Sequence, residues 1–221
     1  MTRTRVSLTR PAQGVSKKIG IYGGTFDPIH YGHLRPALDA MHQLGLSQVR
    51  FVPCYQPVHR DQPSTSSALR CQMLQAAIAH QPGFELERCE IERQGPSFMV
   101  DTLRFLKTQY IGQDLVLLMG SDAFSRFLSW RDSSGILDLA NLAVMHRPGE
   151  SLPQQGELAQ LLHQRLTTKL NQSAGQIIEV EVTQLDVSST QIRHLVQQGV
   201  PIEFLTPRGV IETIKQNKLY I

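Results

Sequence analysis

The sequence predicts an α/β protein: a Rossmann-like, doubly wound parallel sheet with helices on both faces. Short apolar segments bounded by polar or breaker residues alternate along the chain with longer segments of helical periodicity. Alternation of this kind is typical of βαβ units, whose right-handed crossovers place helices on both faces of a parallel sheet. The expected strands are residues 18–22, 49–53, 115–119, 142–145 and 177–182, and the expected helices are residues 32–44, 68–80, 98–109, 157–169, 189–198 and 207–216.

The elements follow one another with clear boundaries. The first strand, 18–22, ends at a Gly-Gly pair, and the second, 49–53, ends at a proline that cannot continue a ladder. Residues 55–67 then form a long loop with two prolines and a Ser/Thr cluster, and loops of this length are often functional lids or disordered. Residues 148–155 form a second loop before the next helix. The helix at 189–198 begins with Ser and Thr, which are favoured around helix N-caps.

Length and charge bound the organisation of the chain. At 221 residues it is long enough for one α/β domain, with or without a small insertion. The net charge of +3 is local, because residues 1–18 hold five basic residues and no acid, which leaves 17 basic against 19 acidic residues elsewhere. We therefore expect a flexible basic tail at 1–17, a single domain at 18–221 and no nucleic-acid partner. A transit peptide would share the tail's composition but needs apolar periodicity that the tail lacks.

Cysteine usage and hydropathy point to the cytoplasm. Cys54, Cys71 and Cys89 are odd in number and form no C-x-x-C pattern, which argues against a disulfide framework and a zinc ribbon. There is no apolar stretch of membrane-spanning length and no signal-peptide core. We expect a cytoplasmic protein without a membrane partner, either a monomer or a homo-oligomer.

A glycine-rich turn, GGTFDPIHYGHL at 23–34, joins the first strand to the first helix. Such a turn exposes backbone N–H groups at a helix N-terminus and suits a phosphate. His30 and His33 share one helical face, and imidazole donates to phosphate oxygens and can carry charge near neutral pH. The turn is neither the dinucleotide fingerprint nor a P-loop. A plain tight turn with two surface histidines is the simpler alternative; a metal site is less favoured because a third ligand is lacking.

A second polar cluster lies near the other end, at SSTQIR, residues 188–193. Arg193 falls three residues after Thr190 and four after Ser189, so the guanidinium sits above those hydroxyls. Together with free N–H groups they would form a polyphosphate clamp. An ordinary N-cap with a solvated arginine is the alternative. Because ligands bind beyond the carboxyl ends of parallel strands, we expect both clusters to converge on one triphosphate.

The two clusters together resemble the nucleotidylyltransferase superfamily, with its H-x-G-H motif (30–33 here) and late S-S-T-x-x-R motif (188–193 here). The longer opening, 23–34, is similar to that of bacterial nicotinate-nucleotide adenylyltransferases, and so are blocks at 53–60, 95–103, 120–122, 130 and 146–149. The resemblance covers the chain from about residue 19 onward. It implies transfer of AMP from ATP to nicotinate mononucleotide, giving deamido-NAD and pyrophosphate in NAD biosynthesis, with Mg²⁺ bridging the ATP phosphates and no metal site of the protein's own.

The resemblance also assigns roles to residues. It makes His30, His33 and Arg193 catalytic, because they would stabilise charge on the phosphates. Asp27 would either fix the turn or touch substrate. The expected ATP-binding residues are Gly23, Gly24, Thr25, Phe26, Gly120, Asp122, Ser188, Ser189 and Thr190. The expected acceptor-binding residues are Cys54, Phe98, Met99, Thr102, Trp130 and Arg147, with Trp130 stacked on the pyridine ring.

Departures from the family pattern keep other acceptors open. Cys54 replaces an asparagine and Met99 a threonine, both expected near the nicotinate group, and the P-P-H-K/R element reads PVHR at 57–60. The alternatives are nicotinamide mononucleotide, another phosphorylated acceptor such as phosphopantetheine, or a non-catalytic nucleotide-binding module. Class I aminoacyl-tRNA synthetases share H-x-G-H but need a much larger chain.

Overall fold

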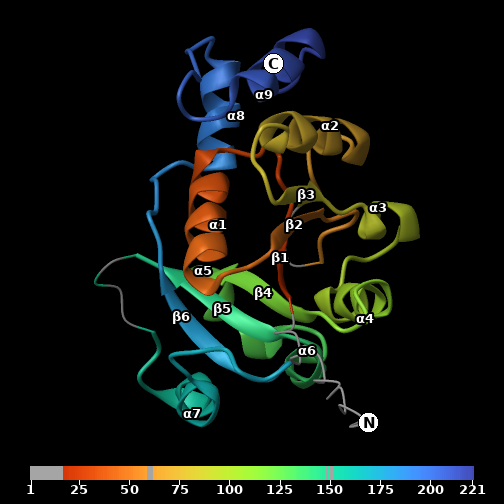
Figure 1. Cartoon of the computed structure of the whole chain (residues 1–221). Helices are drawn as coiled ribbons and strands as arrows, with labels where there is room; N and C mark the ends of the chain where they lie inside the picture. Colours follow the sequence, from red (N-terminus) through yellow and green to blue (C-terminus); the bar gives the residue numbers. More distant parts are fainter. Residues whose placement is uncertain (1–16, 59–61, 148, 150–151) are drawn as a thin grey trace, which may run out of the picture.

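A computed structural model describes residues 17–58, 62–147, 149 and 152–221. Six strands form one sheet in the order β3-β2-β1-β4-β5-β6, and every neighbouring pair is parallel (Figure 1). This is the doubly wound order, which reverses between β1 and β4, so the predicted fold class is confirmed. The strands are β1 (Lys18–Gly24), β2 (Gln48–Pro53), β3 (Phe84–Leu86), β4 (Asp114–Gly120), β5 (Asn141–His146) and β6 (Ile177–Glu181).

Helices cover both faces of this sheet, and each face has its own apolar core. Alternate residues of β4 show the division: Val116 and Leu118 belong to one core, and Leu115 and Leu117 to the other. The first core is covered by α1 (Tyr31–Leu44), α2 (Ser67–Ile78), α8 (Ser189–Gln197) and α9 (Arg208–Gln216). The second is covered by α3 (Cys89–Arg93), α4 (Met99–Gln109), α5 (Ser121–Phe124), η1 (Phe127–Ser129), α6 (Ser133–Leu139) and α7 (Gly156–Arg165).

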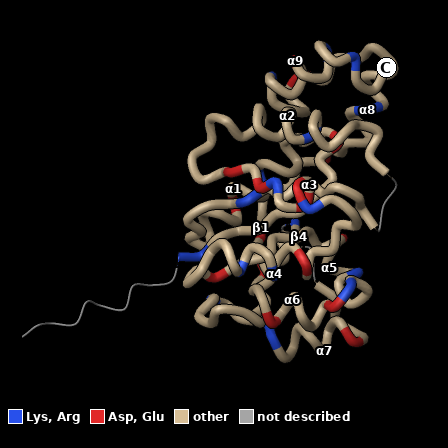
Figure 2. Tube along the Cα trace, turned by 90° about the vertical axis from the view of Figure 1, so that its right-hand side faces the viewer, with Lys and Arg blue, Asp and Glu red and all other residues tan. Residues whose placement is uncertain are grey.

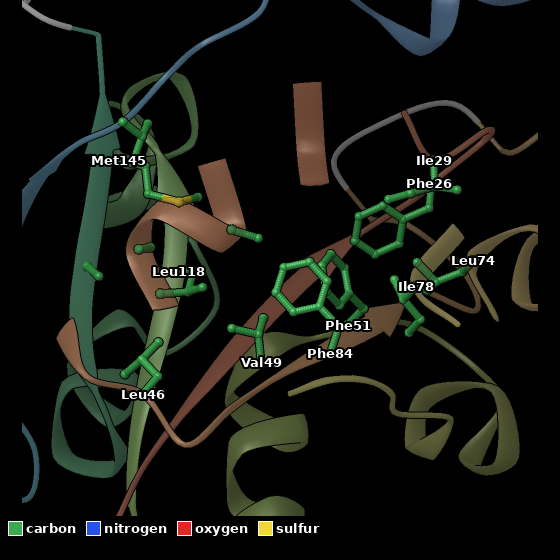
Figure 3. Close-up of a cluster of buried hydrophobic side chains, with 14 of the residues drawn as sticks. Phe26, Ile29, Leu46, Val49, Phe51, Leu74, Ile78, Phe84, Leu118 and Met145 are labelled. Carbon is green, nitrogen blue, oxygen red and sulfur yellow. The ribbon is translucent and has the colours of Figure 1, made fainter. Parts of the chain in front are cut away.

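The glycine-rich turn is anchored in the first core. Figure 3 shows Phe26 and Ile29 of the turn beside Phe51 of β2, and the rings of Phe26 and Phe51 lie 5.9 Å apart. Both turn residues are at most 1% exposed. The turn between β1 and α1 is therefore held in place by apolar packing against the first core.

Several short elements differ from the sequence expectation. The three-residue β3 and the short helices α3, α5, η1 and α6 lack the length that gives a periodic signal. Helix α6 begins with a local cap, since Asp132 has a left-handed φ of 53° and its carboxylate accepts from Gly135 N–H. Helix α7 ends at Arg165 and not at 169, because Thr167 N–H donates to Ile177 O beside β6.

Charge is spread evenly over the described chain. Figure 2 shows Lys and Arg interspersed with Asp and Glu around the fold. Apart from Lys17, the predicted basic tail lies outside the described residues, as do His59 and Arg60 of the long loop. Within the described ranges, the helices are too short or too polar to cross a membrane.

Candidate active site

A cavity of about 890 Å³ opens at the carboxyl ends of the central strands, where the strand order reverses. A cavity of this size suits a nucleotide together with a second small molecule. The structure brings together nearly all the residues predicted for the site. Those that line the cavity are Gly23, Gly24, Thr25, Phe26, His30, His33, Cys54, Phe98, Met99, Gly120, Asp122, Trp130, Arg147, Ser188, Ser189, Thr190 and Arg193.

Thr102 is the predicted acceptor-binding residue that does not line this cavity. Its side chain is 0% exposed, and its hydroxyl donates to Glu90 Oε1 at 2.6 Å. Glu90 itself lines the cavity, so Thr102 contacts a cavity-lining residue from the side away from the cavity. The expected direct contact is therefore replaced by support for the Glu90 carboxylate. The reason is the helical register of α4, which turns Thr102 toward α3.

His30 and His33 lie at the start of α1 with their rings close together and tilted relative to each other. Their centroids are 3.8 Å apart and the ring planes are tilted by 36°. His30 is the N-cap residue and 4% exposed, and burial lowers its pKa to about 4. His30 is therefore a neutral imidazole at pH 7, a donor through one N–H and not a fixed positive charge. The expectation of a charge near neutral pH does not hold for His30.

At the start of α1, one backbone N–H group already hydrogen-bonds another part of the chain. Tyr31 N–H donates to Leu205 O at 3.1 Å, so this donor is not free for a phosphate. Gly32 brings α1 close to the chain before α8: a Cβ on it would lie 2.9 Å from the backbone oxygen of Val187. The glycine between the two histidines thus permits the approach of the second motif.

The second motif contacts the first directly. Ser189 Oγ donates to Pro28 O at 2.9 Å, and Arg193 Nη1 donates to Asp27 O at 2.7 Å. Arg193 Nη2 donates to Thr190 Oγ1 at 3.2 Å, and Ser188 caps α8 by accepting from the backbone N–H of Gln191. The two motifs therefore lie against each other, and the Arg193 contact joins positions 166 residues apart.

Aromatic and sulfur-containing side chains line another part of the cavity. Trp130 follows η1, 6.1 Å from the Phe127 ring, and is half-buried. The guanidinium of Arg131 lies 4.4 Å above the centroid of the Phe98 ring. Cys54 donates to Thr25 Oγ1 at 3.7 Å, and burial raises the pKa of the Cys54 thiol, so the thiol stays neutral. The aromatic rings of Trp130 and Phe98 offer flat faces that suit a heterocycle, and the Arg131 guanidinium lies beside them.

Sequence reasoning missed a buried arginine beneath the site. Arg70 of α2 is 1% exposed and donates to three backbone oxygens: Nε to Thr65, Nη1 to Thr25 and Nη2 to Cys54. It thereby ties the glycine-rich turn, the end of β2 and the long loop together. The available signal was a basic residue three and four positions before Met73 and Leu74, on the apolar face of a predicted helix.

Three further cavity residues, Asp27, Glu90 and Arg131, carry charge into the site. For Asp27 the sequence reasoning left open whether it fixes the turn or touches substrate, and it singled out neither Glu90 nor Arg131. Asp27 is 4% exposed and Glu90 is 3% exposed. For Asp27 the structure shows hydrogen bonds of both carboxylate oxygens to other protein groups, which is the turn-fixing arrangement.

Comparison with known proteins places the chain in a family. A family model described as cytidylyltransferase-like matches residues 21–195. A "Probable nicotinate-nucleotide adenylyltransferase" of Hydrogenovibrio crunogenus is 47% identical over 205 residues, covering 93% of this chain and 98% of the relative. One of the same name from Methylococcus capsulatus is 40% identical over 207 residues, covering 91% and 99%.

Solved structures agree on the fold. A Plasmodium falciparum nicotinic acid mononucleotide adenylyltransferase complexed with APC superposes with a TM-score of 0.70 at 19% identity, covering 92% of this chain and 97% of that one. At this identity the likeness concerns the fold, whereas the relatives of higher sequence identity carry the family assignment. The chain belongs to the nicotinate-nucleotide adenylyltransferase family of nucleotidyltransferases.

Proposed function

We propose that this chain transfers AMP from ATP to the phosphate of nicotinate mononucleotide, giving deamido-NAD and pyrophosphate in NAD biosynthesis. The observation that carries the proposal is the direct contact of Ser189 and Arg193 with the glycine-rich turn. This contact gathers imidazole, hydroxyl and guanidinium donors around one part of the cavity. The relative from Hydrogenovibrio, named for this activity and 47% identical, supports the choice of reaction.

The reaction is an in-line displacement at the α-phosphorus. An oxygen of the acceptor's phosphate forms a bond to the α-phosphorus, and the bond from that phosphorus to the bridging oxygen of the β-phosphate breaks, which releases pyrophosphate. The attacking phosphate is already an anion, so the enzyme needs neither a nucleophile nor a strong base of its own. Catalysis then comes from positioning and from stabilising charge as it develops.

We propose that the charge developing on the phosphates is stabilised by His30, His33 and Arg193. A neutral His30 donates one N–H to a phosphate oxygen, which agrees with its lowered pKa. The Arg193 guanidinium donates to Asp27 O and Thr190 Oγ1, and we assign it to the leaving pyrophosphate. The backbone of the glycine-rich turn would lie close to the bridging phosphates at Gly23, Gly24, Thr25 and Phe26. The pyrophosphate end would be bordered by the start of α8, at Ser188, Ser189 and Thr190.

Asp122, at the start of α5, is assigned to the ribose. Gly120 allows this carboxylate to fold back, because a Cβ on Gly120 would lie 2.7 Å from Asp122 Oδ1. Arg147 also lines the cavity, is exposed, and donates from Nε to Gln184 Oε1 at 2.7 Å. We assign Trp130, Phe98 and Met99 to the pyridine ring and Cys54 to the edge of the same pocket.

We propose that Mg²⁺ enters with ATP and is held by phosphate oxygens. Among the described residues there is no cluster of three or more carboxylate, histidine or cysteine side chains that could hold a metal ion. Mg²⁺ in nucleotide sites is commonly bound through substrate phosphates with few protein ligands. The ion would neutralise charge on the phosphates. We also propose a cytoplasmic location and small-molecule substrates only.

The acceptor is tested by comparing two substrates. Pyrophosphate release is measured with ATP and Mg²⁺, using nicotinate mononucleotide or nicotinamide mononucleotide. We expect a higher kcat/KM for the acid. Equal use or preference for the amide would mean that Cys54 and Met99 reset the acceptor pocket, and no release with either would contradict the proposed reaction.

A further inference from the structure

The carboxylate of Asp27 is buried in the glycine-rich turn and receives three hydrogen bonds. Tyr220 Oη donates to Asp27 Oδ1 at 2.7 Å, and the N–H and Oγ of Ser64 each donate to Oδ2 at 2.9 Å. Asp27 is 4% exposed. A buried carboxylate is stable only when its oxygens are hydrogen-bonded in this way. We call Asp27, Ser64 and Tyr220 the Asp27 clasp.

The clasp acts on the residues that the second motif contacts. The backbone oxygen of Asp27 accepts from Arg193, and that of the next residue, Pro28, accepts from Ser189. Phe26, on the other side, has a positive φ of 51° and is buried in the first core. A displacement of Asp27 would therefore move both oxygens that orient the Arg193 and Ser189 side chains.

Tyr220 is itself held firmly. It follows α9 with a left-handed φ of 65°, and it packs with Leu219 against the first core. The side chain of Thr65 also hydrogen-bonds the Tyr220 hydroxyl, and Leu219 N–H donates to Ile214 O at 3.0 Å. Burial is the main cause of a raised pKa for Tyr220, so the phenol keeps its proton and remains a donor.

We propose that Tyr220 is a positioning residue for AMP transfer, which acts through Asp27 to fix the turn that carries His30 and His33. The residue lies 193 positions from Asp27, and its side chain does not line the cavity. It joins the segment after α9 to the phosphate-binding end of the site. Its kinetic consequence rests on the proposed function, whereas its effect on the turn does not.

The matched test compares two Tyr→Phe variants. Tyr220→Phe removes one hydroxyl from the Asp27 clasp. Tyr110→Phe removes a similar hydroxyl, which donates to Glu87 Oε2 at a distance of 3.2 Å, and neither Tyr110 nor Glu87 lines the cavity. We expect Tyr220→Phe to lower kcat about 10- to 100-fold, since small misplacements of reacting groups cost up to about 100-fold. We expect the KM for nicotinate mononucleotide to stay within about twofold. Tyr110→Phe should leave both parameters unchanged.

Hydrogen exchange supplies a readout that needs no substrate. In Tyr220→Phe the peptide covering residues 23–33 should exchange faster, while peptides of β4 and β5 should match those of the wild type. In an Asp27→Asn background, Tyr220→Phe should add little to either effect, because the charged acceptor is already gone.

Three results would overturn the proposal. The first is an unchanged kcat and exchange pattern in Tyr220→Phe. The second is a change in kcat and exchange that is the same in Tyr220→Phe and Tyr110→Phe. The third is loss of the fold in Tyr220→Phe, which would give Tyr220 a general structural role. A wild-type enzyme that releases no pyrophosphate would instead refute the proposed function. The exchange data would then still decide whether Tyr220 fixes the turn.

Discussion

Acidification should destabilise the protein through His30. This imidazole is 4% exposed and its burial lowers its pKa from 6.5 to about 4. Between these pH values the unfolded chain binds a proton at His30 that the folded chain does not bind. Because the unfolded state binds more protons, the free energy of unfolding rises with pH in this window. The contribution is complete above about pH 6.5 and is lost as the pH falls toward 4.

The size of the effect follows from the two pKa values. At about 1.4 kcal/mol per pH unit, the gap between 6.5 and about 4 corresponds to about 3 kcal/mol in full. Between pH 7 and pH 4.5 about 2 kcal/mol of this should be lost.

The assay is urea unfolding of the wild type and His30→Asn at pH 7 and pH 4.5. The wild type should lose about 2 kcal/mol more than the variant, because only in the wild type does the unfolded chain bind a proton at position 30 that the folded chain does not bind. His80→Asn, which changes an exposed histidine, is the control and should lose as much as the wild type. Equal losses in the wild type and His30→Asn would refute the assignment of a buried neutral imidazole.

Three substitutions test other parts of the site. His33→Ala should lower turnover about 100- to 1,000-fold with an unchanged circular dichroism spectrum, as measured by pyrophosphate release, and near-normal turnover would remove His33 from the mechanism. Arg70→Met should lower the free energy of unfolding in urea by about 3 kcal/mol or more, because one buried and two part-buried hydrogen bonds to backbone oxygens are lost. Arg208→Met changes a side chain that is 93% exposed and should change the free energy of unfolding by less than about 0.5 kcal/mol. Gly32→Ala should lower the free energy of unfolding in urea by about 1–3 kcal/mol and should also lower turnover, because the added Cβ would press on the Val187 backbone oxygen. An unchanged free energy of unfolding together with unchanged turnover would contradict the close approach of α1 to Val187.

Much of the fold follows from periodicity. The strands that the sequence predicted with continuous apolar runs, such as 115–119, lie in the centre of the sheet with both faces covered. The first strand extends two residues further than predicted, because Gly23 and Gly24 still pair with Val52 and Pro53 of β2. Periodicity cannot detect β3, because its three residues are too few for an alternating pattern to be recognised.

The site likewise has residues that the sequence predicts and residues that it does not. Each of the two motifs is local in sequence, so the residue types and their spacing are enough to indicate a phosphate site. Thr102 and Arg70 depend on helical register and on contacts with distant segments, which local spacing does not reveal. Tyr220 carries no sequence signal, because its partner lies 193 residues away.

The central claim is that the acceptor's phosphate attacks the α-phosphorus of ATP. The most direct measurement uses nicotinate mononucleotide whose phosphate carries heavy oxygen, with ATP and Mg²⁺, and mass spectrometry of both products. The account predicts deamido-NAD and pyrophosphate in equal amounts, with all of the label in deamido-NAD. Label in pyrophosphate, or pyrophosphate without a dinucleotide, would contradict it.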